Sequence, residues 1–562
     1  MAAHGNNGPQ PDPANSAGYP ARLQGYRLDE HALPTSLVAL ATQARATHAD
    51  RPALTLVLPQ GMHASLSFAE VDALSDDFAA YLRHDLALQV GDVVALQMPN
   101  SLHYAVAAFG AWKAGAIATN VNPLCTASEL TAQLQDCAAK VLVATVMSLA
   151  TLRPAAAETG VAVVLAGLWD FFSTPAAQAL REALGGEVTL LETECTFAYA
   201  LTQGRRHGPL AARHHEVALL QYTGGTTGRS KGAVLTHRNV LAVLQMTDDY
   251  LSAHDAPFLP SDVVLTVLPL YHVFAFVINF LSFFRKGARN LLVPNPRPLK
   301  NVEPALRQFE VSWITGVDTL YAGLLAEPWF IASPPALRYA ISGGTALRPS
   351  TGQRWRDTVG PMLEGYGLTE TSCIVACSPP NRALQPGSVG LPMPGSEVRV
   401  VDAQGEAVPH GERGELQVRG PHVTRGYRNR PDDNAAAFSG DWFRTGDIVT
   451  MAPDGSIHIV DRLKDMVLVS GFNVYPNEVE AVIAAHPDVA EVAVVGMPDE
   501  ATGEAVCAYV TPRHPGLTAE QVVAHCRLHL TRYKVPKRVL FRDGLPKSPV
   551  GKILRAQLRG ES

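Results

Sequence analysis

The chain has 562 residues, with 46 lysines and arginines against 52 aspartates and glutamates, a net charge of −6 and 47% hydrophobic residues. This is the composition of a globular protein with room for several domains. A mildly acidic chain without a basic block lacks the electrostatics of a nucleic-acid-binding protein, so we do not expect nucleic acid as a partner. The seven cysteines are scattered and include no CxxC pair, which argues against a disulfide framework or a zinc site and favours a cytoplasmic location.

The first 30 residues are rich in Pro, Gly, Asn and Ala and lack the charged-then-apolar order of a signal peptide, so we expect a disordered tail over residues 1–30. Beyond it, strand-like and helical patterns alternate, beginning with a strand at 93–98, a helix at 103–115 and a strand at 116–121. This alternation predicts an α/β fold in which βα sheets build a large domain over residues 31–460.

Residues 263–284 (VVLTVLPLYHVFAFVINFLSFF) carry no formal charge and are long enough to span a bilayer as a helix. However, Pro269, His272 and Asn279 interrupt the run, and the flanking charges do not mark an insertion topology. We therefore interpret the segment as a buried strand that runs into a buried helix, with an apolar ligand cavity compatible with this region. Any membrane contact is expected to be peripheral.

Near residue 440 the pattern changes to short strand-like pieces separated by turns, which predicts a β-rich part at the end of the large domain. The strands predicted from here to the C-terminus are 442–451, 456–461, 489–496 and 505–510. Thr518 and Gln521 form a capping box in front of a helix. We predict that residues 466–562 form a small α+β C-terminal domain.

Residues 222–232 (YTGGTTGRSKG) are the first motif that carries chemistry. Glycines allow close backbone approach, threonines offer hydroxyls and Lys231 supplies a cation, a combination that suits a polyphosphate. The motif is not a Walker A loop, because Lys231 stands between Ser230 and Gly232. A flexible glycine turn is the alternative interpretation. The candidate nucleotide-binding residues are Thr223, Gly224, Gly225, Thr226, Thr227, Gly228 and Lys231.

This loop resembles the phosphate-binding signature of the adenylate-forming superfamily, which comprises acyl-CoA synthetases, peptide-synthetase adenylation domains and luciferases. The similarity extends over residues 35–558 and is greatest to bacterial long-chain fatty-acid CoA ligases. Two positions depart from the commonest form: Gly224 stands where Ser is usual, and Ser230 where Pro is usual. These changes remove a hydroxyl and a rigid turn, but the lysine and the threonine pair remain.

The resemblance implies an acid-thiol ligase that joins a long-chain fatty acid to CoA at the expense of ATP, with Mg²⁺ as cofactor. It also implies a cytoplasmic protein with peripheral contact at the inner face of the membrane, and it is compatible with a homodimer. Thr226 is then a catalytic group and, with Glu370, a candidate magnesium ligand.

Residues 268–276 (LPLYHVFAF) form the second motif. A lone histidine in an apolar run is usually a core residue, but the resemblance places His272 beside the acyl carboxylate, where it would orient carboxylate or phosphoryl oxygens. Phe276 matches the position of an aromatic gate to the acyl tunnel, and ordinary core packing is its alternative. Val317 and Gly343 are the other implied substrate contacts.

Residues 342–346 (SGGTA) and 364–370 (EGYGLTE) resemble the adenine and magnesium motifs of the superfamily. The glycines let a planar base lie against the backbone, Tyr366 offers a stacking face, Thr369 a hydroxyl for the α-phosphate, and Glu370 a hard oxygen ligand for Mg²⁺. A solvated charge is the alternative for Glu370. The candidate residues here are Gly343, Gly344, Tyr366, Gly367, Thr369 and Glu370.

Residues 441–447 (DWFRTGD) and 461–465 (DRLKD) supply a further nucleotide contact and a hinge. Asp447 can accept hydrogen bonds from both ribose hydroxyls, and Arg462 can bind ribose or phosphate oxygens. The charges of 461–465 could belong to a solvated turn. The resemblance instead makes them the hinge between the two domains, with Lys464 at the pivot and Gly471 where the pantetheine arm passes.

Residues 545–555 (LPKSPVGKILR) contain the candidate catalytic lysine. A carboxylate is a poor nucleophile toward an anionic ATP, so a lysine that bridges the two would lower their repulsion and stabilise charge at the α-phosphorus. Lys552 is this candidate. A solvated basic tail is the alternative, and it suits Lys547 better, because apolar residues follow Lys552.

The reaction that the resemblance implies has two steps at one site, acyl-adenylate formation and then thioester formation, with a turn of the small domain between them. Two other interpretations remain. An adenylating enzyme for another carboxylic acid, or one that loads a carrier protein, would share every nucleotide motif. A silent fatty-acid or acyl-AMP binding protein would be expected to lack Lys552 or Glu370, and both are present.

Overall fold

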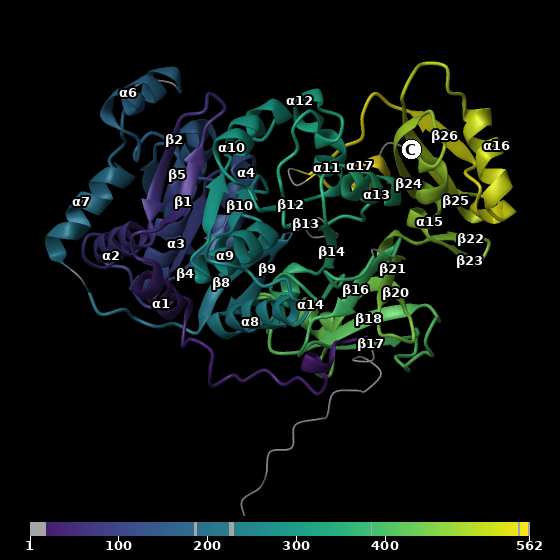
Figure 1. The fold of residues 1–562 in the computed structure, drawn as a ribbon, viewed down its shortest axis with the longest axis horizontal. Coiled ribbons are helices and arrows are strands. Elements are labelled where there is room, and N and C mark those ends of the chain that lie inside the picture. The colour runs from purple at the N-terminus through teal and green to yellow at the C-terminus, as the bar shows by residue number, and fades with distance from the viewer. Residues whose placement is uncertain are drawn as a thin grey trace, which may run out of the picture.

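A computed structural model describes residues 18–184, 188–208, 210–223, 230–383, 385–548 and 551–559. The strands of these residues form three sheets, two in a large N-terminal part and one in a small C-terminal part (Figure 1). This arrangement confirms the predicted fold class, an α/β protein with a large N-terminal domain and a small α+β C-terminal domain.

The first sheet is parallel except at one edge, where β9 runs antiparallel to β8. Its order is β7 (Glu194–Thr196), β6 (Ala162–Ala166), β5 (Ala139–Thr145), β3 (Val93–Gln97), β4 (Ile117–Asn120), β8 (Val217–Thr223) and β9 (Lys231–Thr236). The central strands β3 and β4 are buried along their whole length, as expected for strands of a parallel sheet that is covered on both faces.

The second sheet has a parallel and an antiparallel part. The parallel strands are β1 (Pro52–Val57), β11 (Arg289–Leu292), β10 (Val263–Thr266), β12 (Trp313–Gly316), β13 (Tyr339–Gly343) and β14 (Met362–Tyr366). The antiparallel strands are β2 (His63–Ser67), β15 (Ala376–Cys377), β16 (Ser388–Pro392), β17 (Glu397–Val401), β18 (Gly414–Arg419), β19 (Phe438–Ser439), β20 (Trp442–Met451) and β21 (Ile457–Arg462). The last of these form the predicted β-rich part.

Helices cover the sheets of the large domain (Figure 1). They are α1 (Leu37–His48), α2 (Phe68–His84), α3 (Leu102–Ala114), α4 (Ala127–Cys137), α5 (Leu149–Thr159), α6 (Thr174–Ala183), α7 (Phe197–His207), α8 (His237–Ala253), α10 (Glu303–Gln308), α11 (Asp318–Leu324), α12 (Pro328–Ile331), α13 (Pro349–Thr358) and α14 (Pro431–Ala437). Helix α3 is buried on every side because it contacts β3 and β4 of the first sheet and β1 of the second. It therefore lies between the two sheets.

The third sheet belongs to the small domain. Its strands are β23 (Phe472–Val474), β22 (Val467–Val469), β25 (Gly503–Pro512), β24 (Val489–Asp499) and β26 (Arg538–Phe541), with helices α15 (Pro476–Ala484), α16 (Ala519–His529) and α17 (Arg555–Arg559). The predicted capping box is confirmed at α16: Gln521 N donates to Thr518 Oγ1 at 3.3 Å, and Thr518 N donates to Gln521 Oε1 at 2.8 Å.

The uncharged segment 263–284 is buried. It consists of β10, a turn that contains Pro269, a π-helix η4 (Ala275–Ser282), and the start of α9 (Phe283–Arg285). Every residue of η4 is buried, so the predicted strand leading into a buried helix is confirmed. Within the described ranges, no helix is both long and apolar enough to cross a membrane.

Part of the predicted N-terminal tail packs on the large domain. Tyr19 OH donates to Pro392 O at 2.6 Å, Tyr26 OH donates to Asp249 Oδ2 at 2.7 Å, and Leu23 joins the main hydrophobic core. Residues 18–30 are thus ordered, because three apolar or aromatic side chains anchor them. The prediction of a tail is too long at this end, and residues 1–17 lie outside the described residues.

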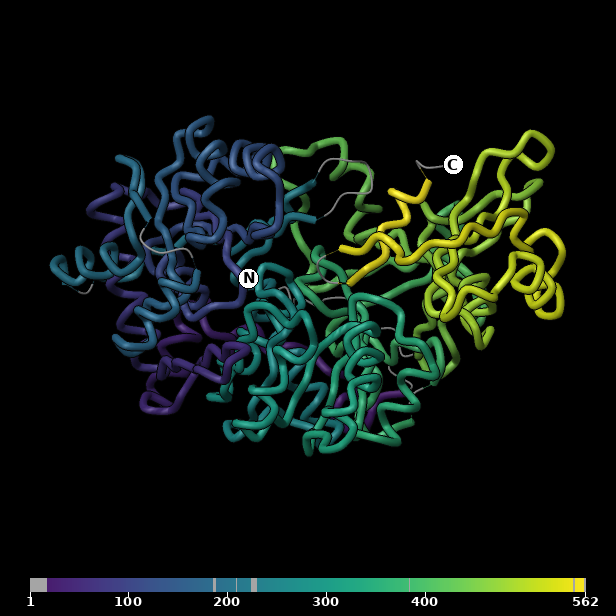
Figure 2. Tube along the Cα trace, turned by 90° about the horizontal axis from the view of Figure 1, so that it is seen from above, coloured from purple at the N-terminus to yellow at the C-terminus, as the bar shows by residue number. Residues whose placement is uncertain are grey.

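The C-terminal segment returns from the small domain to the large one, as the yellow tube in Figure 2 shows. Gly551 marks the contact: a Cβ at this glycine would lie 2.9 Å from Thr319 Oγ1 and 3.3 Å from Val317 Cγ2. Its backbone also has φ +83°, which favours glycine. A loop of the small domain is therefore in close contact with Val317, one of the predicted substrate contacts, and with its neighbour Thr319.

Candidate active site

The predicted phosphate loop connects β8 to β9. Thr223 and Lys231 face each other across this antiparallel pair, so they stand at the two bases of the loop. Between them, Gly224, Gly225, Thr226, Thr227 and Gly228 lie outside the described residues. Lys231 forms an ion pair with Asp433, and its ammonium lies 5.5 Å from the centre of the Tyr427 ring. The lysine is therefore held at the base of the loop by two residues of the segment 427–433.

Glu370 lies close to this lysine, although the two motifs are far apart in sequence. It belongs to the short helix η6 (Thr369–Thr371), is only 8% exposed, and its Oε1 accepts a hydrogen bond from Tyr427 OH at 2.7 Å. Burial and the nearby Glu370 carboxylate raise the pKa of Tyr427, so its phenol stays protonated and remains a donor. Tyr427 thus joins Glu370 to Lys231, with Thr369 beside them.

Asp447, Arg462 and Tyr366 form a second group. Asp447 on β20 is paired in register with Arg462 on β21, and Arg462 Nε lies 2.8 Å from Asp447 Oδ1. Tyr366, the last residue of β14, donates from its hydroxyl to Asp447 Oδ2 at 2.6 Å. Burial and this carboxylate raise the pKa of Tyr366 well above its usual value. Both partners orient the carboxylate that the sequence assigns to the ribose.

The predicted glycines occur where backbones or side chains approach closely. A Cβ at Gly343 would lie 3.1 Å from Phe274 Cε1 and 3.2 Å from Gly365 O, and one at Gly367 would lie 1.7 Å from Cys373 O. Gly344 has φ +77°, and a Cβ there would lie 4.0 Å from Val317 Cγ1. Gly344 and Val317 are therefore neighbours.

His272 lies in the turn between β10 and η4. Its Nδ1 accepts a hydrogen bond from Phe274 N at 3.3 Å, which leaves the proton on Nε2. Burial and the positive charge of Lys552 lower the pKa of His272 to about 4. At neutral pH the imidazole is therefore an uncharged group with a single N–H donor.

Phe276 is completely buried in η4. Its ring centre lies 5.6 Å from that of Phe280, 6.0 Å from that of Trp112 and 6.2 Å from that of Tyr104. The phenylalanine thus belongs to an aromatic cluster that packs η4 against helix α3.

Lys552 of the small domain lies among these residues of the large domain. Its loop is closed by hydrogen bonds from Ser548 N to Lys552 O at 2.7 Å and from Lys552 N to Ser548 Oγ at 3.2 Å. The side chain reaches solvent, yet both domains surround it closely. This burial and the charge of Arg462 lower the pKa of Lys552 to about 8. The carboxylate of Asp447 acts in the opposite direction and raises this pKa. Lys547, in contrast, pairs with Glu491 of the small domain itself.

The predicted hinge carries a network of charges. Lys464 lies in the short helix η7 (Leu463–Asp465), where partial burial lowers its pKa. Arg555 Nη2 lies 2.7 Å from Glu480 Oε2 and its Nη1 lies 3.4 Å from Asp465 Oδ2, so one arginine ties the segment after Lys552 to the hinge. The structure does not bring Gly471 to the other site residues: it occupies the exposed turn between β22 and β23 (Figure 1).

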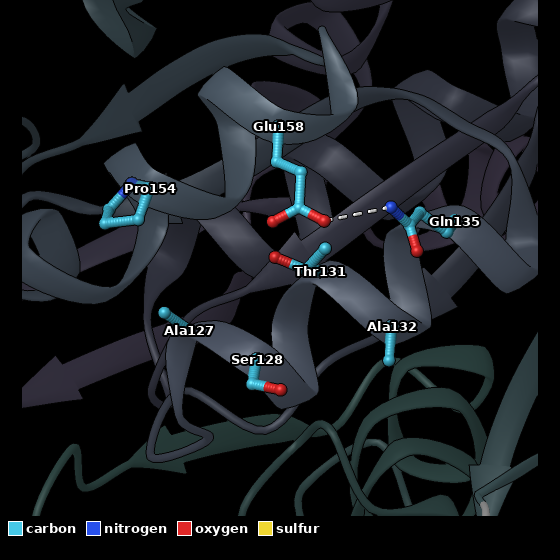
Figure 3. A pocket seen from close by; sticks show the side chains of 7 residues that line it. All are labelled: Ala127, Ser128, Thr131, Ala132, Gln135, Pro154 and Glu158. Carbon is cyan, nitrogen blue, oxygen red and sulfur yellow. Dashed lines mark hydrogen bonds between the residues drawn. The ribbon is translucent and has the colours of Figure 1, made fainter.

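A surface cavity of about 360 Å³ lies elsewhere, between α4 and α5 (Figure 3). It is lined by Ala127, Ser128, Thr131, Ala132, Gln135, Pro154 and Glu158, and Gln135 Nε2 donates to Glu158 Oε1 at 3.3 Å. None of the predicted site residues lines it, so this cavity is not the candidate active site.

Sequence reasoning missed Tyr427 and Asp433. Pro431, Asp432 and Asp433 carry the signal of a helix N-terminus, and α14 does begin at Pro431. That signal predicts a helix but says nothing of its neighbour in space. The ion pair to Lys231 therefore could not be found from the sequence.

Known proteins resemble the chain over most of its length. A family model described as AMP-binding enzyme matches residues 40–428, and a model described as AMP-binding enzyme C-terminal domain matches residues 478–552. The long-chain-fatty-acid–CoA ligase of Yersinia pestis is 43% identical over 539 residues, which cover 94% of each chain. The Haemophilus influenzae protein of the same name is 38% identical over 540 residues, again 94% of each chain. ATP-bound MatB from Rhodopseudomonas palustris superposes with a TM-score of 0.81 at 29% identity, covering 94% of this chain and 99% of MatB.

Proposed function

Because this chain belongs to the AMP-binding enzyme family, we propose that it is an AMP-forming long-chain fatty-acid–CoA ligase. It converts a fatty acid, ATP and CoA into acyl-CoA, AMP and pyrophosphate. The names of the two bacterial relatives support the acid and the thiol, and the ATP-bound neighbour supports the nucleotide. The observation that carries the proposal is the position of Lys552, which the small domain presents to His272 and Asp447 of the large domain and to Arg462 of the hinge.

In the first step a carboxylate oxygen of the fatty acid attacks the α-phosphorus of ATP, and the bond from that phosphorus to the bridging oxygen breaks to release pyrophosphate. Lys552 reduces the repulsion between the two anions and stabilises the charge that develops at the phosphorus. His272 donates its Nε2–H to an oxygen of the carboxylate or the phosphoryl group. An uncharged hydrogen-bond donor is sufficient at this position, because Lys552 already supplies the positive charge.

The nucleotide is held by the two groups described above. Lys231 and Thr223, with Gly224, Gly225, Thr226, Thr227 and Gly228, bind the phosphates, while Asp447 and Arg462 hold the ribose. Gly343, Gly344, Tyr366, Gly367 and Thr369 bind the adenine and the α-phosphate.

Glu370 fits a magnesium ion, since Mg²⁺ takes one or two carboxylates together with substrate phosphates, and Thr226 is the second candidate ligand. Bound there, the ion would neutralise phosphate charge.

In the second step the CoA sulfur attacks the acyl carbonyl carbon, and the bond from that carbon to the phosphate oxygen breaks to release AMP. Lys552 stands where the first step needs it, so the small domain must turn away before the thiol approaches. We assign the pivot to Lys464 and expect the turn to bring Gly471 toward the pantetheine arm. The domain limits we propose are 31–460, a hinge at 461–465, and 466–562.

The proposed site residues specify the carboxylic acid less closely than they specify the nucleotide. His272, Phe276, Val317 and Gly343 are the proposed acyl contacts, and a ligase for a medium-chain, aryl or signalling acid, or for a carrier protein, would share the nucleotide residues. Because a long-chain acid partitions into membranes, we propose peripheral contact at the inner face of the membrane; a homodimer is compatible with this function.

A pyrophosphate-release screen with carboxylic acids of graded length, with and without CoA, tests the function. We expect release to depend on the acid, to be largest for long chains, and to turn over faster when CoA is present. A maximum with aryl or short acids would replace the proposed specificity. No release with any acid would contradict the proposal as a whole.

A further inference from the structure

The turn that carries His272 is held by side-chain amides of the neighbouring sheet. Asn100, in the loop after β3, is only 2% exposed. Its Nδ2 lies 3.0 Å from both Thr266 O and Leu268 O, and its Oδ1 accepts a hydrogen bond from Leu270 N at 2.8 Å. One amide thus satisfies three backbone groups of the segment that leads into His272.

A second amide holds the next residue. Gln221 of β8 is 4% exposed, and its Nε2 donates to Tyr271 O at 2.9 Å. Its Oε1 accepts from Asn120 Nδ2 at 2.9 Å, and Asn120 Oδ1 accepts from Tyr104 OH at 2.8 Å. A chain of hydrogen bonds therefore runs from helix α3 through β4 and β8 to the peptide group that joins Tyr271 to His272.

Gln221 lies on β8 of the first sheet and Asn100 in the loop after β3 of that sheet, whereas the turn follows β10 of the second sheet. Gln221 also precedes Thr223, the first residue of the phosphate loop, by two positions. The hydrogen bond to Tyr271 O therefore links the strand that ends at the phosphates to the turn that carries the imidazole. Burying an amide is unfavourable unless its hydrogen bonds are made. Here Asn100 makes three of its hydrogen bonds, and Gln221 one, with the segment 266–271 that leads into His272.

We propose that Asn100 and Gln221 are positioning residues for His272, and we call the pair the amide clamp. The clamp fixes the Nε2–H donor of His272 relative to the phosphate loop, so that the donor meets the reacting oxygens without reorganisation. This inference rests on the proposed function, because it assigns the clamp to the adenylation step.

Gln221→Met tests the clamp, because methionine keeps the volume and removes the donor. Gln133→Met is the matched control: Gln133 of helix α4 donates from Nε2 to Asn120 O of β4 at 3.0 Å, so it is also an amide bonded to this sheet but does not touch the His272 turn. We expect Gln221→Met to lower kcat of acyl-adenylate formation by roughly tenfold to a hundredfold, as a misplacement of about 1 Å does, and to change KM for ATP by less than about threefold. Gln133→Met should leave both within about twofold.

The pH profile separates positioning from general destabilisation. A released His272 gains water, so its pKa rises from about 4 toward the ordinary value for histidine. Lys552, which faces the imidazole, is unchanged in the variant. A proton on Nδ1 takes away the acceptor for Phe274 N, so the protonated ring loses the hydrogen bond that orients it. The kcat of Gln221→Met should therefore fall below a pH of about 6 while that of the wild type stays level. A purely structural defect would lower kcat equally at every pH.

Tyr104→Phe is a milder second variant, because it removes one hydroxyl at the far end of the hydrogen-bond chain. We expect a smaller loss of kcat in the same direction, with KM for ATP unchanged. If Gln221→Met and Gln133→Met behave alike, or if KM for ATP rises as much as kcat falls, the clamp is overturned while the proposed function stands. A wild-type protein that forms no acyl-adenylate would overturn both.

Discussion

Tyr427 is the residue that connects the two phosphate-side motifs. Its hydroxyl donates to Glu370 and its ring faces the Lys231 ammonium, so a carboxylate and a cation from distant motifs share one neighbour. The hydrogen bond from Tyr427 holds the Glu370 carboxylate in a fixed orientation inside a largely buried site. A carboxylate held in this way is suited to the proposed role of Glu370 as a metal ligand.

Glu370→Ala should slow adenylation at least tenfold, or about 1.4 kcal/mol, because the variant loses the ligand that places magnesium on ATP. The rate should also need more magnesium to saturate. Glu194→Ala is the control, since Glu194 is as buried as Glu370 but lies far from it in the first sheet. Glu194 belongs to β7, the edge strand opposite to the Lys231 strand β9, and pairs with Arg153. A magnesium titration of acyl-adenylate formation measures both effects, and an unchanged rate with an unchanged titration would end the assignment.

If Lys552 has the proposed role, its lowered pKa predicts that adenylation is sensitive to alkaline pH. A lysine is charged below its pKa, so the Lys552 cation is present at neutral pH and is lost as pH rises through about 8. We expect kcat/KM for adenylation to fall above that pH with a single ionisation. Measurement over roughly pH 6.5–9.5 checks this, since kcat/KM reports the groups of the free enzyme.

Lys552→Arg is the control for this ionisation. The guanidinium stays charged throughout that range, so the variant should show a lower rate but no alkaline limb. An alkaline limb that is the same in both proteins would assign the ionisation to another group.

At the scale of elements, the buried aromatic cluster around η4 decides whether Phe276 is a gate or only core. Phe276 and Phe280 are both completely buried and pack edge to face, so replacing either by alanine should destabilise the fold by roughly 3–5 kcal/mol. Only Phe276→Ala should also change the preference for acyl chain length. Pyrophosphate release with acids of graded length measures that preference; equal shifts in both variants, or none, would make Phe276 an ordinary core residue.

The helices and strands that could be predicted are those with a clear hydrophobic pattern or a helix cap in the sequence. The strands at 93–97 and 117–120 and the helix between them follow from apolar runs and a glycine at the helix end, and α16 follows from its capping box. The π-helical turns of η4 could not be predicted, because a uniformly apolar run has no face to mark its period.

The site was predictable only in part, for a related reason. Residues such as Lys231 and Glu370 stand in glycine-rich motifs that indicate their chemistry. Their partners Tyr427 and Asp433, like Gln221 beside the His272 turn, are determined by proximity in the folded chain and carry no local signal. The contact of Gly551 with Thr319 likewise depends on how the two domains meet.

At the scale of the whole molecule, the burial of residues 263–284 bears on membrane contact. Because this apolar segment forms β10 and η4 inside the large domain, we expect any attachment to a bilayer to be peripheral. Carbonate extraction of membranes should therefore release the protein. Retention in the pellet, as for an integral protein, would contradict the buried-segment interpretation.

The two-domain arrangement leads to the central claim, that the small domain serves the two half-reactions in different positions. Lys552 would act in the first, and the hinge at Lys464 would permit the second. Lys552→Ala should nearly abolish acyl-adenylate formation while sparing the conversion of supplied acyl-AMP and CoA into acyl-CoA. Lys464→Pro should do the reverse, because proline fixes φ and stiffens a hinge that must rotate.

Single-turnover rates of each half-reaction in these two variants test the claim most directly. Lys547→Ala is the matched control, since Lys547 lies in the same loop but pairs with Glu491 of the small domain. We predict that Lys552→Ala fails only in adenylation, Lys464→Pro only in thioester formation, and Lys547→Ala in neither. If Lys552→Ala slows both half-reactions equally, Lys552 is a structural residue and the alternation of the small domain is contradicted.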